Sequence, residues 1–317
     1  MSERSAAARI RSHSSWRLRH PFRFMRGVLP RALPLQIRRR MFAPLPKPEW
    51  GDPAEWETAI QTMPQAIGSG GATTAAVSIC IVSHQNLALT RLCVESIFRL
   101  TTCAPFEVTV ADNGSTDGTA EWLRGEGRVR ALLARSNEGF PAACNKAVAA
   151  TSAPIIAILN NDVVVTPQWL DLLVAQLSAA DDVGMVGPVT NACGNEARVR
   201  ARYRSLPSML AFAGTRRRAC SGEAFEIPAL ALFCAVIRRS TWEEVGPLDE
   251  RFGRGLFEDD DYSHRLHAAG YRTVCREDAF VHHWGRAALR TLGEEEHALY
   301  LRNERLFREK WGPKSPR

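Results

Sequence analysis

The sequence lacks a long uninterrupted apolar run. Its longest apolar stretch covers residues 227–237 and contains Pro228, whereas a membrane-spanning helix needs about 20 apolar residues. The first fifty residues also lack the apolar segment of about 7 to 15 residues that a secretory signal requires. We therefore expect neither a transmembrane helix nor a secretory signal.

Two short motifs are also missing. None of the eight cysteines forms a C-x-x-C pair, and several lie in apolar runs, so we expect reduced thiols in a protein that faces the cytoplasm. No G-x-G-x-x-G or other glycine-rich loop follows Val82, where the first expected strand ends; Ser83-His84-Gln85-Asn86 stands there instead. This absence argues against a dinucleotide-dependent oxidoreductase and a sugar-phosphate nucleotidyltransferase.

Positive charge is concentrated at the start of the chain. The first fifty residues hold eleven Arg and one Lys against two Glu, so the formal net charge of +7 belongs to this region and the remainder is slightly acidic. A nucleic-acid-binding domain is therefore not expected as the main function. Three interpretations of the region stay open: an interfacial arm on anionic lipid, a transit peptide, or a solvated basic tail.

The pattern of apolar residues predicts an α/β protein. We expect a basic amphipathic tail over residues 1–63, a flexible Gly- and Ser-rich linker over residues 64–76, and a folded body that begins near Val77. Strands alternate with helices in that body, which is typical of a mostly parallel sheet flanked by helices. The expected strands are residues 77–82, 106–111, 129–134, 155–159, 183–186, 229–237, 271–274 and 279–282. The expected helices are residues 89–100, 119–123, 142–150, a helix that Thr166 caps, a helix with a capping box at Ser240 and Glu243, residues 258–269 ending at Gly270, and residues 294–311.

Two of the expected strands end in acidic residues. Asp112 begins the turn-rich run 112–119, and Asp162 closes Asn160-Asn161-Asp162. Ligands of open α/β sheets bind outside the carboxyl ends of parallel strands. Asp112 is therefore either the start of an Asx turn or a carboxylate that contacts a base or ribose. Asp162 is either a loop residue or an oxygen ligand for Mg²⁺ or Mn²⁺ on a diphosphate.

Further acids and histidines lie near the C-terminus. The run 258–261 consists of Glu258 and three aspartates, and such acids either complement a helix macrodipole or supply a general base and substrate ligands. The pair at residues 282 and 283 ends a short strand and is either structural or metal-binding. Each signal has a structural alternative when taken alone.

Taken in order, these segments resemble the family 2 glycosyltransferases, which are inverting enzymes with the GT-A fold. The likeness covers about residues 77–312 and is closest to bacterial rhamnosyltransferase-like members that build surface polysaccharides. The motifs that carry it are Val77 to Ser83, Asp112 to Thr119, Asn137-Glu138-Gly139-Phe140 with Asn145, Leu159 to Asp162, Phe257 to Tyr262 with His282, and Arg302-Asn303.

The resemblance implies a role for each matching residue. It places Asp259 as the catalytic base with Glu258 as its acidic neighbour, and Asp162 as the last acid of a D-x-D motif that holds Mg²⁺ or Mn²⁺ on the donor diphosphate. Asn160, which replaces the first acid of that motif, and His282 complete the implied metal site. The implied donor-binding residues are Ser83, Asp112, Asn113, Ser115, Gly139, Asn145 and Asn161. Ala147 stands where many relatives have Gly.

The implied reaction transfers a sugar from a nucleotide-sugar donor, linked to UDP, dTDP or GDP, to a hydroxyl of a glycan or lipid-linked glycan acceptor. Residues 77–165 are then the nucleotide-sugar-binding half, and residues 166–317 the acceptor-binding half with a C-terminal helix. The arginines between residues 198 and 218 suggest a phosphate-bearing acceptor or, alternatively, a solvated loop. We expect a cytoplasmic protein, peripheral on the inner face of the cell membrane. A metal-dependent phosphohydrolase and an inactive membrane-associated adaptor of the same fold are the alternatives.

Overall fold

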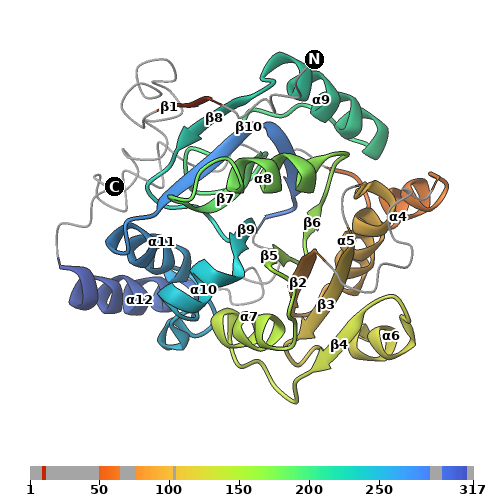
Figure 1. Ribbon diagram of the computed structural model, residues 1–317. Helices are drawn as coiled ribbons and strands as arrows, with labels where there is room; N and C mark the ends of the chain where they lie inside the picture. The colour runs from red at the N-terminus through yellow and green to blue at the C-terminus, as the bar shows by residue number, and fades with distance from the viewer. Residues whose placement is uncertain (1–8, 12–49, 65–75, 103–104, 286–294, 313–317) are drawn as a thin grey trace.

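The computed structural model describes residues 9–11, 50–64, 76–102, 105–285 and 295–312. Within them, ten strands form one mixed sheet with helices packed against it (Figure 1). The strand order is β1-β8-β10-β7-β9-β5-β2-β3-β4, and β6 pairs with β10 off this path. The predicted α/β class is confirmed.

The first half of the body is a four-stranded parallel sheet in the order β5-β2-β3-β4. Its strands are β2 (Val77–Ser83), β3 (Phe106–Asp112), β4 (Arg130–Leu133) and β5 (Ile155–Asn160). The connecting helices are α5 (Leu87–Leu100), α6 (Thr119–Gly125) and α7 (Phe140–Ala149). Because β3 lies on one side of β2 and β5 on the other, the strand order reverses at β2, which is where open α/β sheets bind ligands.

The second half extends the same sheet with mixed pairing. The antiparallel strand β9 (Cys234–Arg238) lies between β5 and β7 (Val183–Thr190). Strand β10 (Arg272–His283) pairs with β7, with β8 (Glu223–Glu226) and with β6 (Val163–Val164), and β1 (Arg9–Arg11) adds to β8. The two short strands predicted here are one strand, because the break between them is only a register shift after Arg276.

The helices of the second half are α8 (Trp169–Leu177), α9 (Leu206–Ala219), α10 (Arg239–Val245), the 3-10 turn η1 (Glu250–Phe252), α11 (Glu258–Ala268) and α12 (Glu295–Trp311). Gly270 after α11 has the expected left-handed backbone, with φ of 87°. Two predicted caps are wrong: Thr166 donates to the Phe280 carbonyl instead, and α10 begins at Arg239, before Ser240. The capping box lies at the start of α9, at Ser205 and Ser208.

Part of the predicted tail belongs to the folded body. Helix α4 (Pro53–Gln61) packs against α5, and its Trp56 and Ile60 are buried in the main hydrophobic core. The predicted start of the body near Val77 is therefore wrong for this segment. The same core continues through both predicted halves, whereas residues 12–49 and 65–75 of the predicted tail and linker lie outside the described residues.

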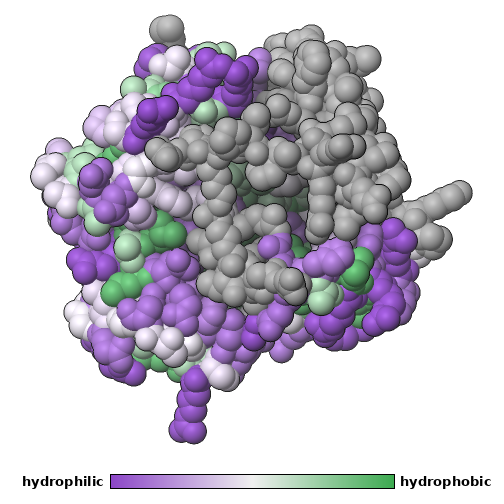
Figure 2. Space-filling view, turned by 180° about the vertical axis from the view of Figure 1, so that it is seen from behind, coloured by the Kyte–Doolittle hydropathy of each residue, from purple (hydrophilic) through white to green (hydrophobic). Residues whose placement is uncertain are grey.

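The described surface is mostly hydrophilic on the face seen in Figure 2, with small hydrophobic patches. No helix in the described part of the chain combines the length and apolar character needed to cross a membrane. The described cysteines have free thiols. Burial raises the pKa of the Cys80 thiol to about 12, which makes it a weak nucleophile at neutral pH.

Candidate active site

The carboxyl ends of β2, β3 and β5 bring predicted donor-binding residues together. Ser83 is in register with Asp112, and the preceding Val82 is in register with Asn160. The Asn161 amide donates to the Thr90 hydroxyl at 2.9 Å and to Ser83 Oγ at 3.3 Å. The carboxyl ends of these three neighbouring strands therefore lie at one edge of the sheet, which we call the donor edge after its predicted role.

Asp112 organises the turn that follows β3. Its carboxylate accepts hydrogen bonds from the backbone N–H of Ser115, at 3.1 Å, and from the Ser115 hydroxyl. Ser115 Oγ also accepts from the backbone N–H of Gln85 at 2.7 Å. Asp112 thus accepts from the backbone three residues on, not two as in the Asx turn considered for it. Contact of Asp112 and Ser115 with a donor stays a prediction.

Asn113 holds this turn against the segment 137–139. Its amide donates to Asn137 Oδ1 and to the Gly139 carbonyl, both at 3.0 Å, and its Oδ1 accepts from the Glu138 N–H at 2.8 Å. Every polar atom of the side chain is engaged in these contacts. Asn113 therefore shapes the floor of the donor edge, and a direct contact with a donor would compete with these bonds.

Gly139 lies where the two halves meet. Its φ is 96°, and a Cβ added there would lie 2.2 Å from the Gly253 carbonyl oxygen, which accepts from the Phe140 N–H at 3.1 Å. We expect Gly139→Ala to lower the free energy of unfolding by about 2 to 4 kcal/mol through backbone strain and overpacking. Urea denaturation measures this change in the free energy of unfolding.

Gly127→Ala is the matched control for this prediction. Nothing lies within 4 Å of a Cβ at Gly127, so the free energy of unfolding should change by no more than about 0.5 kcal/mol. Equal stability of the two variants would show that the backbones at Gly139 and Gly253 are not in close contact.

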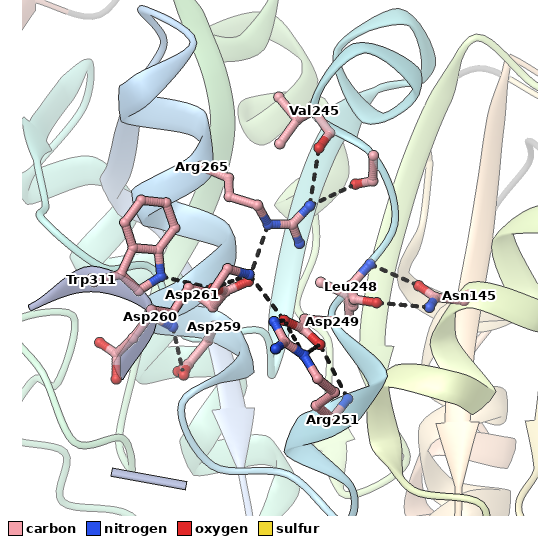
Figure 3. A network of polar contacts seen from close by, with 12 residues as sticks. Asn145, Val245, Leu248, Asp249, Arg251, Asp259, Asp260, Asp261, Arg265 and Trp311 are labelled. Atoms are coloured by element: carbon pink, nitrogen blue, oxygen red, sulfur yellow. Dashed lines mark hydrogen bonds and ion pairs between the residues drawn. The ribbon is translucent and has the colours of Figure 1, made fainter. Parts of the chain in front are cut away.

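Asn145 on α7 joins the halves a second time. Its amide group donates to the Leu248 carbonyl and to Glu250, both at 3.0 Å, and its Oδ1 accepts from the Leu248 N–H at 2.9 Å (Figure 3). The side chain thus fixes the segment that leads into η1. Its predicted donor contact is untested.

Asp162 faces His283. The antiparallel pairing of β6 with β10 aligns Val163 with His283, and Asp162 precedes Val163 in the turn. The Asp162 carboxylate lies 3.1 Å from His283 Nε2, and His283 Nδ1 lies 2.7 Å from the Ala192 carbonyl. Both side chains are nearly buried. The resemblance implied His282 at this place.

His282 is packed among aromatic rings instead. Its Nδ1 lies 2.7 Å from the Tyr203 hydroxyl, and its ring centroid lies 5.0 Å from those of Trp50 and Trp56 and 4.5 Å from that of Trp284. Neighbouring side chains of a strand point to opposite faces, so His282 and His283 cannot share one environment. Its predicted role as a metal ligand stays untested.

The pKa values of the two histidines are shifted in opposite directions. Burial lowers the pKa of His282 well below its usual value, and the neighbouring His283 lowers it further. Burial also acts to lower the pKa of His283, but the charge and hydrogen bonding of Asp162 and the Ala192 carbonyl outweigh it, so this pKa is raised. Asp162 therefore favours the protonated form of His283, and this proton must leave before the imidazole can bind a metal.

Asp162 and His283 fit part of a metal site. A carboxylate suits Mg²⁺ and Mn²⁺, and imidazole is a common metal ligand. No group of three or more His, Cys, Asp or Glu side chains that could hold a metal occurs among the described residues. Mg²⁺ commonly uses one or two carboxylates and completes its coordination with substrate phosphates and water. The pair fits a cation that is bound together with a diphosphate.

The acidic run forms the first turn of α11, and its members have different surroundings. Asp261 is fully buried and contacts Arg265, Lys310 and Trp311 (Figure 3). Asp260 is buried, whereas Asp259 is partly exposed and accepts from the Asp260 N–H at 2.9 Å. Asp261 is thus a structural residue, and Asp259 is more accessible to a substrate than Asp260.

Glu258 lies near Gly255 and α7. A Cβ built at Gly255 would lie 3.7 Å from Glu258 Oε1 and 3.9 Å from the Phe140 Cβ, and the charge of Glu258 helps to raise the pKa of Cys144 on α7. Burial, followed by the charges of Asp259 and Asp260, raises the pKa of Glu258 well above its usual value. Glu258 therefore binds a proton more readily than an exposed glutamate, which reduces the negative charge at the start of α11.

Comparison with known proteins identifies the family of this fold. The family model described as "Glycosyl transferase family 2" matches residues 78–244, more than half of the chain. The chain belongs to glycosyl transferase family 2.

Several relatives are similar to this chain in sequence. The uncharacterized protein y4gI of Sinorhizobium fredii is 31% identical over 66% of this chain and 24% of its own length. The O-antigen biosynthesis protein RfbC of Myxococcus xanthus is 29% identical over 76% of this chain and 20% of its own length. The N-acetylglucosaminyl-diphospho-decaprenol L-rhamnosyltransferase of Mycobacterium tuberculosis is 30% identical over 58% of this chain and 68% of its own length. This chain thus spans at most a quarter of the first two relatives.

A solved structure supports the fold. The crystal structure of GalNAc-T7 with UDP, GalNAc and Mn²⁺ is similar with a TM-score of 0.52 and 18% identity, over 66% of this chain and 43% of that chain. The predicted GT-A fold is confirmed.

The arginines between residues 198 and 218 have two kinds of surroundings. Arg216 pairs with Glu277, and Arg217 donates to the Pro167 carbonyl, so these two side chains serve the packing of α9. The four arginines at alternate positions from 198 to 204 are exposed, while Val199 and Tyr203 between them are buried. We call Arg198, Arg200, Arg202 and Arg204 the arginine row; none of its side chains forms an ion pair with another described residue.

Proposed function

We propose that this protein is an inverting glycosyltransferase that moves a sugar from a nucleotide-sugar donor to a hydroxyl of a glycan or lipid-linked glycan, in the synthesis of a cell-surface polysaccharide. The observation that carries the proposal is the close approach of the donor edge to the acidic helix. Gly139 borders the donor edge and touches Gly253. Glu258 and Phe140, the residue after Gly139, both lie within 4 Å of the position of a Cβ at Gly255, and the charge of Glu258 helps to raise the pKa of Cys144 on α7. A donor and a carboxylate base can therefore meet at one place.

The proposed chemistry is a single displacement. Asp259 accepts the proton of the acceptor hydroxyl, whose oxygen bonds to the anomeric carbon as the bond from that carbon to the diphosphate breaks. Attack from the face opposite the leaving group inverts the anomeric centre, and no covalent sugar intermediate forms. Asp112 and Ser83 hold the nucleotide at the ends of β3 and β2.

A bound Mg²⁺ or Mn²⁺ would neutralise the charge that develops on the leaving diphosphate. In this proposal Asp162 and His283 hold the cation, and Asn160 offers only a neutral oxygen. The pairing of these side chains supports the assignment. His282, which the resemblance implied as a ligand, would then support Tyr203 and the aromatic rings around it.

The names of the relatives support a role in surface polysaccharide synthesis. One is an O-antigen biosynthesis protein, and another is a rhamnosyltransferase that acts on a lipid diphosphate carrying N-acetylglucosamine. We propose the same class of acceptor here, with an acidic or phosphate group. We propose that the donor carries a hexose or a deoxyhexose.

A panel of UDP, dTDP and GDP sugars with Mn²⁺ or Mg²⁺ tests the proposed function. A bound donor should raise the melting temperature, and the chain should release a nucleoside diphosphate at a rate that grows with added acceptor. Release of orthophosphate would instead indicate a phosphohydrolase. Absence of any product with every donor and acceptor would indicate an inactive adaptor.

The arginine row is the proposed contact for an acidic acceptor. Guanidinium groups bind phosphate with two parallel hydrogen bonds. Arg200→Glu with Arg202→Glu should raise the acceptor KM by about tenfold or more, since a hydrogen bond to a charged group is worth about 1.5 to 3 kcal/mol. Steady-state kinetics with donor and acceptor varied in turn measure it, and the donor KM should not change.

Arg124→Glu with Arg305→Glu is the control of equal charge. Both residues are exposed and form only surface ion pairs, so the acceptor KM should stay within about twofold. An equal rise in both double variants would assign the effect to net charge and remove the proposed contact. Reversal of Arg216 would be an unsuitable test because this residue pairs with Glu277.

We also propose that the protein works in the cytoplasm, peripheral to the inner face of the membrane through its basic N-terminal residues. Their positive charge supports binding to anionic lipid, at about 1 kcal/mol for each Lys or Arg near the surface. Co-sedimentation with anionic vesicles should fall when residues 1–47 are deleted. Equal binding of both chains would contradict the proposal.

A further inference from the structure

The segment between η1 and α11 has an uncommon backbone. Leu256 and Phe257 both have left-handed conformations, with φ of 72° and 75°. Large side chains rarely adopt this region, and two in succession persist only where surrounding contacts enforce them. This segment leads directly into Glu258 and Asp259, so its conformation determines where the first turn of α11 begins.

Asn303 of α12 makes the contacts that enforce this backbone. The side chain is fully buried, and its amide group donates to the carbonyls of Phe252 at 2.7 Å, Gly255 at 2.8 Å and Leu256 at 3.1 Å. A buried carbonyl without a partner is unfavourable. The two N–H groups of one side chain therefore serve three carbonyls along the segment that precedes the acidic run, with one N–H shared between two carbonyls.

The surroundings of Asn303 exclude water from these bonds. Phe252, Phe257 and Phe307 form a second hydrophobic cluster between α12 and the segment, separate from the main core. The ring centroids of Phe257 and Phe307 are 5.7 Å apart. Hydrogen bonds in an apolar setting are stronger and more restrictive than those in water.

The far end of α12 contacts α11 itself. Trp311 Nε1 donates to Asp261 at 2.8 Å, and the Lys310 ammonium lies 2.8 Å from Asp261 and 2.9 Å from Asp249. Figure 3 shows Trp311 beside the acidic run. Helix α12 thus touches the chain before and within the acidic turn, although it lies outside the residues that the family model matches.

We infer that Asn303 is a positioning residue for Glu258 and Asp259. It fixes the left-handed segment so that the acidic turn starts in the orientation needed at the donor edge. The inference rests on the proposed function for its effect on catalysis, but the effect on the segment itself does not depend on any activity.

The test compares Asn303→Ala with Phe307→Leu, which loosens the same cluster without removing a hydrogen bond. Asn303→Ala should lower kcat by about 10- to 100-fold, the scale of a small misplacement of catalytic groups, while the donor KM stays within about twofold. Amide hydrogen exchange of residues 253–259 should become about tenfold faster or more. Phe307→Leu should lower the melting temperature but keep kcat within about threefold.

Several outcomes would overturn the inference. They are an unchanged kcat in folded Asn303→Ala, an equal loss of kcat in Phe307→Leu, or unchanged exchange of residues 253–259. If Asn303→Ala does not fold, Asn303→Ser retains a hydroxyl donor and is judged by the same measurements. If the unaltered protein transfers no sugar, the proposed function fails, and the exchange rates alone decide whether Asn303 holds the segment.

Discussion

Asp259→Asn is expected to lower kcat by about 10²- to 10⁴-fold, the usual contribution of a general base. The substitution preserves the volume of the side chain and removes the proton acceptor. Asp259 lies in the first turn of α11, where the helix dipole stabilises a carboxylate, and it is partly exposed. Donor binding, measured by thermal shift, should survive because Asp112 and Asp162 lie on other elements.

Two neighbouring substitutions sharpen this prediction. Asp260 lies about 100° further around the helix than Asp259. The variant Asp260→Asn should therefore keep most of the turnover. Glu258→Gln mimics the protonated form that the raised pKa of Glu258 favours, so its effect should be smaller than that of Asp259→Asn. If Asp260→Asn abolishes turnover and Asp259→Asn does not, the base is Asp260. If neither matters, the acidic run only stabilises the helix.

Exhaustive chelation is expected to abolish turnover, and added Mn²⁺ or Mg²⁺ to restore it. Asp162→Asn and His283→Ala should each weaken metal binding in the presence of nucleoside diphosphate by about 10- to 100-fold, the range seen when groups that support a metal are removed. Titration with Mn²⁺ followed by magnetic resonance measures this affinity.

His282→Phe is the informative comparison for the metal site. It keeps an aromatic ring among Trp50, Trp56 and Trp284 and loses only the hydrogen bond to Tyr203. Its metal affinity should remain near that of the unaltered protein. A loss as large as that of His283→Ala would restore His282 as a ligand, and full turnover after chelation would remove the metal from the proposal.

The sequence was sufficient to predict which strand ends meet at one edge of the sheet. Parallel strands place their carboxyl ends at one edge, so strands ending at Ser83, Asp112 and Asn160 had to bring these residues together once the strands were recognised. Neighbouring side chains of a strand point to opposite faces, so only one of His282 and His283 can face Asp162. The sequence does not show which of them does, because that depends on which face of β10 meets Asp162. The pairing of β10 with β6 determines which face this is, and β6 is a strand of two residues that no apolar pattern indicates.

Other features depend on contacts between distant segments. The apolar residues of the Arg-rich helix α9 show no strong helical periodicity, so the helix was not predicted. Trp56 and Ile60 gave only a short apolar pair, and their burial comes from packing on α5. Asn303 had no local signal for its function, because its three acceptors lie about fifty residues earlier in the chain.

The position of β10 affects how the chain acquires its structure during synthesis. This strand comes from residues 272–283 yet lies between β8 and β7, in the interior of the sheet. Until β10 leaves the ribosome, the largely apolar strand β7 has no partner on one side. Unpaired strand edges of this kind promote association between chains. Nascent or prematurely terminated chains that end before Arg272 should therefore depend on chaperones, while the parallel unit from β2 to β5 can form early.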